Sequence, residues 1–309
     1  MTGDKRKRLN MQKRDEKNGT RKIDDFFFKS FPKDPLNSAI AFSKKFSLFE
    51  KGDKVVVAVS GGKDSVFLLH ILSTFKSKFG IREVISAHFN HMTRGEESSR
   101  DEKFVISLSE KFGIKVIVGK AGKKLESEEE MRAERYRFLD EVAKSENANK
   151  IATAHTLDDQ LETFLLNLVR GKGFFSAGGI FPKNSSICSV PVVRPLLSVK
   201  SKDIKNYLTK NNLPYIFDSS NIDLSFTRNK IRAFLSMLPD EIYDSMLNGF
   251  FKFWLGTMAV YNLLSEIHQK SPDIIPKFLG IQIESFLKGE KLSFEEIKLA
   301  LSEIEKGRS

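Results

Sequence analysis

The sequence Val55-Val-Val-Ala-Val-Ser-Gly-Gly-Lys-Asp-Ser65, followed by the apolar stretch 66–75, decides the fold of this chain. The β-branched run 55–59 predicts a buried strand, and 66–75 has the apolar spacing of a helix. Two glycines between them let the backbone turn tightly and expose its N–H groups, while the helix N-terminus adds the positive end of a dipole. The stretch therefore predicts a strand, an anion-binding turn and a helix.

The turn Ser60-Gly61-Gly62-Lys63-Asp64-Ser65 differs from two familiar phosphate-binding patterns. It lacks the G-x-x-x-x-G-K-[ST] spacing of a P-loop and the G-x-G-x-x-G fingerprint of dinucleotide-binding folds. Its serine hydroxyls and the lysine ammonium add donors to those of the backbone. A Gly-Gly pair alone indicates only a turn, but a strand before it, a helix after it and serines beside it favour an anion site.

Outward from this turn, short β-branched runs alternate with amphipathic stretches. Strands are predicted at 55–59, 83–88, 115–118 and 151–154, with helices at 64–76, 99–112 and 128–146. Strands joined by helices of this length form right-handed βαβ units. The sequence therefore predicts an α/β fold, a doubly wound parallel sheet, in a domain spanning 40–235. Ligands of such sheets bind beyond the carboxyl ends of the strands.

Two later regions break the alternation. Residues 171–187 include Gly171, Gly173, Gly178 and Gly179, and this composition predicts a functional loop. From about residue 240 the strand signals stop, and helices are predicted at 240–270 and 293–306. These helices are expected to form a small C-terminal helical domain over 240–309.

Polar residues that carry chemistry gather just after the predicted strands. Four of these residues lie at or just after the end of the second predicted strand, and three lie in the helix that follows the third strand. Five more follow the fourth strand, and the last four lie further along the chain. In that order they are His88, Asn90, His91 and Arg94; Glu130, Arg132 and Arg135; His155, Asp158, Asp159, Glu162 and Arg170; and Arg194, Arg228, Asn229 and Arg232.

The Ser-Gly-Gly-Lys-Asp-Ser element resembles the pyrophosphate-binding loop, or PP-loop, of the N-type ATP pyrophosphatases. With the ordered set of motifs over about 52–235, the chain resembles the tRNA(Ile)-lysidine synthetase family. The resemblance implies an adenine nucleotide alpha hydrolase-like fold, with ATP and Mg2+ as cofactors. It also implies that Ser60, Gly61, Gly62, Asp64 and Ser65 hold the pyrophosphate end of ATP, with Asp64 next to the metal.

The resemblance further implies the reaction and its partners. The cytidine O2 of an isoleucine tRNA attacks the α-phosphate of ATP, and the ε-amine of L-lysine then displaces AMP at C2. Expected catalytic residues are Asp64, Asp158, Asp159, Glu162 and Arg228, and expected nucleotide contacts include Lys63, His88, Asn90, His91 and His155. Expected substrate or RNA contacts are Arg94, Glu130, Arg132, Arg135, Arg170, Arg194, Asn229 and Arg232. The chain after Arg232 is shorter than the extensions with which bacterial members grip tRNA, so the mode of tRNA binding stays open.

Each motif also has a plainer interpretation. The carboxylates Asp158, Asp159 and Glu162 repel one another unless a cation or amine lies among them, and a solvated helix face is the alternative. The arginines are typical phosphate donors, but each one alone is also typical of a surface ion pair. The chain has five His and one Cys, too few to favour a zinc site at His88 and His91.

The formal net charge is +11, but nine basic and three acidic side chains in residues 1–22 account for +6 of it. Residues 1–30 are expected to form a disordered basic tail. A solubilising tail, a nucleic-acid-binding arm and a nuclear address are the open interpretations. Ile23, Phe26 and Phe27 resemble a box that docks on the DNA sliding clamp, although packing on the globular domain is the plainer alternative. A clamp-tethered DNA-associated ATP-binding protein is therefore a rival function.

The single cysteine of the chain limits which reactions and metal sites are possible. With Cys188 alone, a disulfide scaffold or a Cys-ligated metal cluster is excluded, and tRNA 2-thiolation by the same adenylation chemistry is disfavoured, because such enzymes use several cysteines. No apolar run approaches the roughly 20 residues that span a bilayer. The expectation is a cytoplasmic enzyme with no membrane partner.

Overall fold

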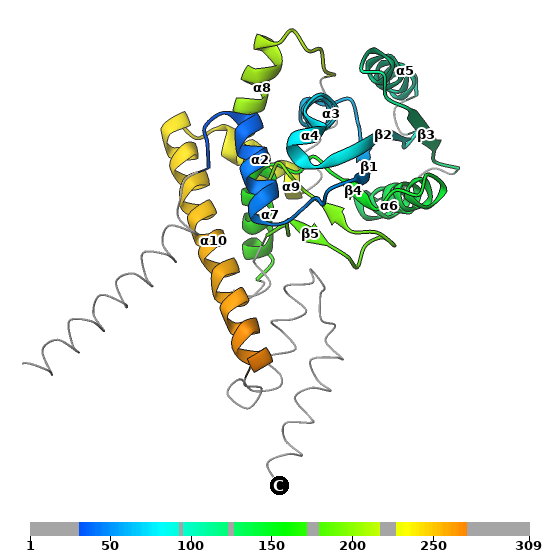
Figure 1. Ribbon diagram of the computed structural model, residues 1–309. Coiled ribbons are helices and arrows are strands. Elements are labelled where there is room, and N and C mark those ends of the chain that lie inside the picture. Colours follow the sequence, from blue (N-terminus) through cyan, green and yellow to red (C-terminus); the bar gives the residue numbers. More distant parts are fainter. Residues whose placement is uncertain (1–30, 93–94, 123–126, 172–178, 217–226, 271–309) are drawn as a thin grey trace, which may run out of the picture.

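A six-stranded sheet forms the centre of the computed structural model, which describes residues 31–92, 95–122, 127–171, 179–216 and 227–270 (Figure 1). The strand order is β3-β2-β1-β4-β6-β5. All neighbouring pairs are parallel except β5 and β6, which are antiparallel. The predicted doubly wound parallel sheet is confirmed, with one antiparallel strand added at its edge. The strands are β1 (Asp53–Ala58), β2 (Ile81–Asn90), β3 (Val116–Lys120), β4 (Lys150–Ala152), β5 (Lys183–Asn184) and β6 (Val192–Val193).

The central strand β1 buries both of its faces. Val55, Val57 and Val59 belong to the larger apolar cluster, whereas Val56 belongs to a second cluster on the opposite face. Successive side chains of a strand point to opposite faces, so an uninterrupted valine run suits a strand that is covered on both sides. This is why 55–59 reads as continuously apolar.

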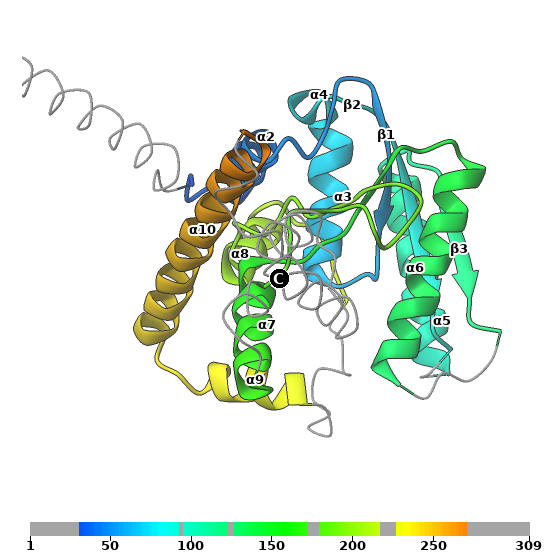
Figure 2. The same ribbon diagram turned by 90° about the horizontal axis from the view of Figure 1, so that it is seen from below.

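Helices cover the two faces unequally. α6 (Glu128–Ser145) packs against the second cluster, and α3 (Lys63–Thr74) and α5 (Glu96–Lys111) pack against the larger one. These three helices confirm the predicted ones to within a few residues. The remaining helices are α2 (Pro35–Lys45), α4 (Lys76–Phe79), α7 (Leu157–Val169), α8 (Ser201–Lys210), α9 (Thr227–Ser236) and α10 (Asp240–Lys270). α7, α9 and α10 lie together, away from β3 and α5 (Figure 2).

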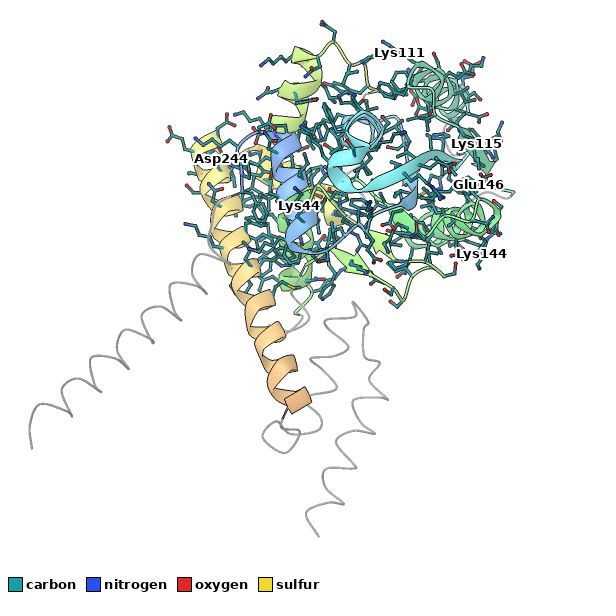
Figure 3. The ribbon with its side chains drawn as sticks, viewed as in Figure 1. Lys44, Lys111, Lys115, Lys144, Glu146 and Asp244 are labelled. Carbon is teal, nitrogen blue, oxygen red and sulfur yellow. The ribbon has the colours of Figure 1, made fainter. Side chains whose placement is uncertain are left out.

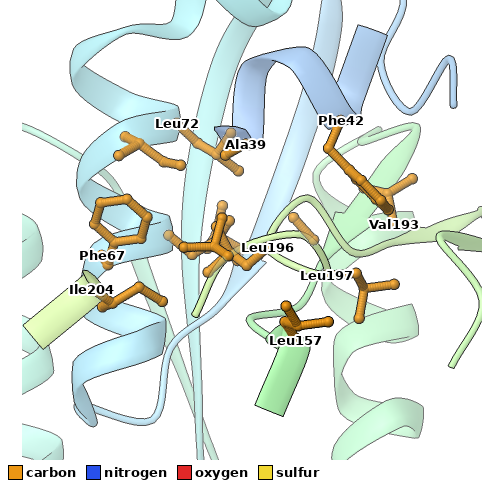
Figure 4. Packing of buried hydrophobic residues seen from close by; sticks show 14 of the residues in the cluster. Ala39, Phe42, Phe67, Leu72, Leu157, Val193, Leu196, Leu197 and Ile204 are labelled. Atoms are coloured by element: carbon orange, nitrogen blue, oxygen red, sulfur yellow. The ribbon is translucent and has the colours of Figure 1, made fainter. Parts of the chain in front are cut away.

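The larger cluster joins elements from distant parts of the sequence. Ala39 and Phe42 of α2 lie near Phe67 of α3 and Ile204 of α8 around the end of β6 (Figure 4). Trp254 of α10 is 1% exposed and stacks on Phe42, with ring centroids 6.2 Å apart. The described part of the predicted C-terminal helical segment thus packs into the same core as the sheet. The helix predicted at 293–306 lies outside the described residues, and the domain limits stay a prediction.

The strand order places a crevice at one point of the sheet. β2 and β3 lie on one side of β1, while β4 and β6 lie on the other, so the direction of winding reverses between β1 and β4. Ligands of doubly wound sheets bind at such a reversal, beyond the carboxyl ends of the strands. The Ser-Gly-Gly turn after β1 and residues 153–156 after β4 both lie there. Among the described helices, none is long and apolar enough to cross a membrane.

Candidate functional site

The turn after β1 is held by its own serines. Ser60 donates its backbone N–H to Ser65 Oγ at 3.2 Å, and Ser65 Oγ donates to the Gly62 carbonyl at 2.8 Å. Gly61 has a φ of +91°, and a Cβ there would come within 2.9 Å of Ile216 Cδ1. Gly62 caps α3 without a side-chain hydrogen bond to the first turn. The helix start therefore presents backbone N–H groups to a ligand, as an anion site requires.

Lys63 and Asp64 form the next layer of the site. Lys63 Nζ contacts both oxygens of Asp64, at 3.0 and 2.8 Å, and also Ser201 Oγ at the start of α8. Ser201 Oγ in turn lies 3.4 Å from Asp64 Oδ1. The turn at Ser60–Ser65 is thus tied to α8, an element that no sequence motif had linked to it.

The start of α7 carries the three carboxylates, and each has its own partner. Asp159 completes a capping box with Thr156, accepting the Thr156 backbone N–H at 2.8 Å. Asp158 accepts the Ser201 backbone N–H at 2.7 Å and the Tyr243 hydroxyl at 2.6 Å. His155 directly precedes the N-cap Thr156 and so lies outside α7.

Two arginines of α9 neutralise the acidic side of α7. Arg232 binds Glu162 through two hydrogen bonds of 2.8 Å, and Arg228 Nε lies 3.2 Å from the same carboxylate. The Glu162 side chain is only 7% exposed, which rules out the solvated helix face for this residue. From the sequence we expected either a cation or amine among the carboxylates or a solvated helix face. In the structure, two arginine guanidinium groups place positive charge beside Glu162. Asn229 lies between the two arginines on the same helix.

The ionisation of these carboxylates is uneven. Burial raises the pKa of Asp64 to about 6, with Lys63 opposing the shift and Asp159 and Asp158 adding to it. Burial also raises the pKa of Asp158, although the hydrogen bonds from Tyr243 and Ser201 oppose this. Burial alone would raise the pKa of Asp159, but the charges of His155 and Arg228 and the Thr156 N–H hold it below its usual value. Asp64 is thus the carboxylate that is most easily protonated near neutral pH.

A divalent metal would suit this site only together with phosphate. Within the described ranges, no group of three or more His, Cys, Asp or Glu side chains could hold a metal by itself. Mg2+ is usually bound by one or two carboxylates plus substrate phosphates, and Asp64 beside the anion turn fits that mode.

The polar residues at and just after the end of β2 mainly order the protein itself; His88 and Asn90 lie within this strand, which is longer than predicted. His88 is buried and donates Nδ1–H to the Val59 carbonyl at 2.8 Å, and burial lowers its pKa. Asn90 donates to Glu102 Oε2 at 2.9 Å and to the Ser98 carbonyl at 3.2 Å, which fixes the start of α5. The His91 ring packs edge-on against Phe89. Arg94 lies outside the described residues.

A second group of cations lies on the other side of the crevice. Arg132 and Arg135 of α6 lie over the Tyr136 ring, at 5.1 and 5.7 Å from its centroid. Arg194 follows β6, is 2% exposed and donates to the Phe181 carbonyl at 2.7 Å. Burial lowers the pKa of His155 far below its usual value, and the positive charges of these three arginines lower it further.

The structure separates some predicted residues from this centre. Glu130 lies on the exposed first turn of α6, and Arg170 is exposed at the end of α7. Ile23, Phe26 and Phe27, together with residues 172–178 of the glycine-rich loop, lie outside the described residues. Ser201 and Tyr243 were missed, because neither belongs to a motif that sequence inspection could connect with the turn.

Comparison with known proteins places the chain in a family. The family model of the PP-loop domain matches residues 36–238. The chain is 34% identical to a tRNA(Ile)-lysidine synthase of Petrotoga mobilis, over 83% of each sequence. The chain belongs to the tRNA(Ile)-lysidine synthase family of PP-loop proteins. The resemblance to this family is therefore confirmed, and the turn at Ser60–Ser65 lies within the residues that the family model matches.

Other relatives show the extent of the match within the lysidine synthase family. A Clostridium perfringens tRNA(Ile)-lysidine synthase is 35% identical over 86% of this chain, and one from Bacteroides thetaiotaomicron is 36% identical over 80%. The chain spans 58% of the length of these two relatives. Among solved structures, the U34-tRNA thiolase NcsA from Methanococcus maripaludis superposes with a TM-score of 0.54 at 18% identity, covering 77% of this chain and 80% of that one. This likeness shows a shared fold.

Proposed function

We propose that this chain is an ATP-dependent ligase that forms lysidine in an isoleucine tRNA. The cytidine O2 attacks the α-phosphorus of ATP, and the bond to the β-phosphate oxygen breaks to release pyrophosphate. The ε-amine of lysine then attacks C2, the C2–O bond breaks to release AMP, and the amine loses its protons to solvent or to a carboxylate. The observation that carries the proposal is the serine-held turn at the start of α3, beside the buried carboxylates of α7.

We assign binding of the pyrophosphate end of ATP to the turn at Ser60–Ser65 and to Lys63. The backbone N–H groups at the start of α3 and the Ser60 and Ser65 hydroxyls offer oriented donors to phosphate oxygens. Mg2+, held by Asp64 together with phosphates, would neutralise the charge that develops on the departing pyrophosphate. Lys63 would then exchange its contact with Asp64 for one with the nucleotide.

Lysine needs an acidic environment to enter as a cation and a way to lose its proton. An unperturbed lysine amine has a pKa near 10.4, so it is not nucleophilic at neutral pH. Asp158, whose pKa is raised by burial, and Asp159, whose pKa is lowered, lie side by side at the start of α7. We assign orientation of the ammonium to this pair and contact with the RNA and nucleotide phosphates to Arg132, Arg135 and Arg194.

The deciding experiment is incubation of the protein with Mg-ATP, labelled lysine and total tRNA, followed by nucleoside analysis. The expected result is lysine joined to cytidine, together with AMP and pyrophosphate. Formation of AMP on the RNA without lysine would keep adenylation but assign another nucleophile. Sulfur transfer is the less favoured alternative, since burial raises the pKa of the chain's single cysteine, Cys188, to about 11.

A pair of glycine variants tests the turn directly. Gly61 and Gly52 have nearly the same φ, +91° and +93°, but a Cβ at Gly61 meets Ile216 whereas one at Gly52 meets nothing within 4 Å. Both alanine variants carry the same backbone strain, and only Gly61→Ala crowds the pyrophosphate turn. We expect Gly61→Ala to abolish AMP release and Gly52→Ala to retain it. Equal activity of the two variants would contradict the assignment of the turn.

A further inference from the structure

One contact connects the long helix α10 with the acidic start of α7. The Tyr243 hydroxyl donates to Asp158 Oδ1 at 2.6 Å, while Asp158 Oδ2 accepts the Ser201 backbone N–H at 2.7 Å. Both oxygens of this carboxylate are therefore fixed, one by α10 and the other by α8. Neither partner belongs to the sequence motifs of the site.

The same contact continues to the pyrophosphate turn. The Ser201 hydroxyl contacts Lys63 Nζ and lies 3.4 Å from Asp64 Oδ1. A continuous series of polar contacts thus runs from Tyr243 through Asp158 and Ser201 to Lys63 and Asp64. It passes through four helices, α10, α7, α8 and α3.

The Tyr243 hydroxyl is not needed to hold α10 in place. Leu247, Trp254 and Leu255 of α10 are buried in the larger apolar cluster, and burial of large side chains accounts for most of the packing energy. Two ion pairs, Lys200 with Asp244 at 2.7 Å and Lys202 with Asp240 at 2.5 Å, also join α8 to the start of α10, where Asp244 is labelled in Figure 3. The hydroxyl therefore adds orientation at Asp158 rather than attachment of the helix.

We infer that Tyr243 is a positioning residue of the nucleotide site: its hydroxyl fixes Asp158 and, through Ser201, sets the position of Lys63 and Asp64 at the pyrophosphate turn. The inference rests on the proposed function only for the identity of the ligand, ATP. It assigns to the start of α10 a direct effect on nucleotide binding.

The test compares two tyrosines that each lose only a hydroxyl. Tyr243→Phe removes the hydrogen bond to Asp158, and the control Tyr207→Phe removes one to His70 Nε2, 3.3 Å away between α8 and α3. Ser201→Ala breaks the same series from its other end, because it keeps the backbone N–H bond to Asp158 and loses the contacts with Lys63 and Asp64. Unfolding midpoints of all three variants establish that they are folded.

The deciding measurement is the affinity for Mg2+ with α,β-methylene ATP, by calorimetry. Because Tyr243 acts on the ligand only through other residues, we expect the effect of a hydrogen bond of ordinary strength, which corresponds to about fivefold weaker binding. We expect this loss for Tyr243→Phe and for Ser201→Ala, with Tyr207→Phe within about twofold of the unaltered protein. If Tyr243→Phe binds as tightly as Tyr207→Phe, the inference is wrong. Lysidine formation by the unaltered protein is scored separately, so a failure of the proposed reaction is distinguished from a failure of this inference.

Discussion

The two sides of the crevice balance their charges in different ways. On the α7 side, Glu162 is paired with Arg228 and Arg232 through contacts of 3.2 and 2.8 Å. On the α6 side, within the described part of the chain, Arg194 forms no ion pair and donates instead to a backbone carbonyl. One side is therefore neutralised within the protein, and the other keeps a buried positive charge next to His155.

This difference separates arginines that pair with a buried carboxylate of the protein from a buried arginine that does not. The sequence alone does not distinguish the two kinds. A buried carboxylate that loses its arginine is left without compensation, which is costly. A buried guanidinium that faces no carboxylate has lost its hydration without gaining an opposite charge. A bound anion would compensate this loss. We expect the first kind to control stability and the second to control nucleotide or RNA binding.

The largest effect is expected from Arg232→Ala, which removes a positive charge on the α7 side of the crevice, where Glu162 is paired within the protein. The variant leaves Glu162, with a 7% exposed side chain, without its bidentate partner. Because Arg232 itself is 36% exposed, we expect a loss of roughly 2–4 kcal/mol in the free energy of unfolding, below the full cost for a deeply buried pair. Urea unfolding measures this loss.

Arg137→Ala is the matched control for that loss. Arg137 also binds two carboxylates, Glu134 and Glu141, each at 2.7 Å, but its side chain is 61% exposed. Exposed pairs of this kind contribute little to stability, so Arg137→Ala should lower the free energy of unfolding far less than Arg232→Ala does. Equal destabilisation by Arg232→Ala and Arg137→Ala would show that burial of Glu162 does not matter.

Arg194→Met tests the other side and should act on binding more than on stability. Methionine keeps much of the volume and removes a buried charge that no described carboxylate matches, so the free energy of unfolding should change by less than about 1.5 kcal/mol. Because the Arg194 charge helps to lower the pKa of His155, that pKa should rise in the variant. Titration of the His155 ring followed by NMR measures the shift.

Binding of Mg2+ with α,β-methylene ATP provides the second readout for Arg194→Met. Loss of a phosphate contact should weaken binding by about tenfold, whereas Arg137→Met, which removes an exposed arginine paired with Glu134 and Glu141, should leave it unchanged. An Arg194→Met protein that binds normally and has an unshifted His155 would mean that the two sides do not differ as described.

The sequence predicted those parts of the molecule in which neighbours in the chain are neighbours in space. The strand, turn and helix around Gly61 and Gly62 are local, and their valine run, glycines and apolar helix are enough to define them. The three later strands and the helices between them followed from periodicity. α2 was missed, although Asp34 accepts the Asn37 N–H and Pro35 begins the helix, two recognisable start signals.

The partners within the site could not be predicted, because they come from distant segments. Arg232 lies 70 residues after Glu162, and Tyr243 lies 85 residues after Asp158. The motif set showed that arginines and carboxylates occur in the same chain, but not which arginine neutralises Glu162 and which ones face the nucleotide. Only the packing of α9 and of α10 against α7 brings these partners together.

The smallest expected effect is a difference in pH dependence between the unaltered protein and Arg194→Met. The folded-state pKa of His155 is lowered. Below pH 6.5 this imidazole therefore binds a proton in the unfolded chain but stays neutral in the folded protein. The free energy of unfolding is therefore highest above pH 6.5 and falls as the pH drops toward the folded-state pKa. Arg194→Met raises that pKa, so its loss of stability should level off at a higher pH as the pH falls from 6.5 toward the folded-state pKa.

Urea unfolding of both proteins at several pH values measures this difference. His70 and His88, whose pKa values burial also lowers, add the same loss to both proteins. Protonation of Asp64, with its pKa of about 6, acts in the opposite direction, because a raised carboxyl pKa makes the folded state bind the proton more tightly as the pH falls. That contribution is also common to both, so the difference between the two curves reports the interaction of Arg194 with His155. Parallel curves would mean that the cationic side of the crevice does not act on this imidazole.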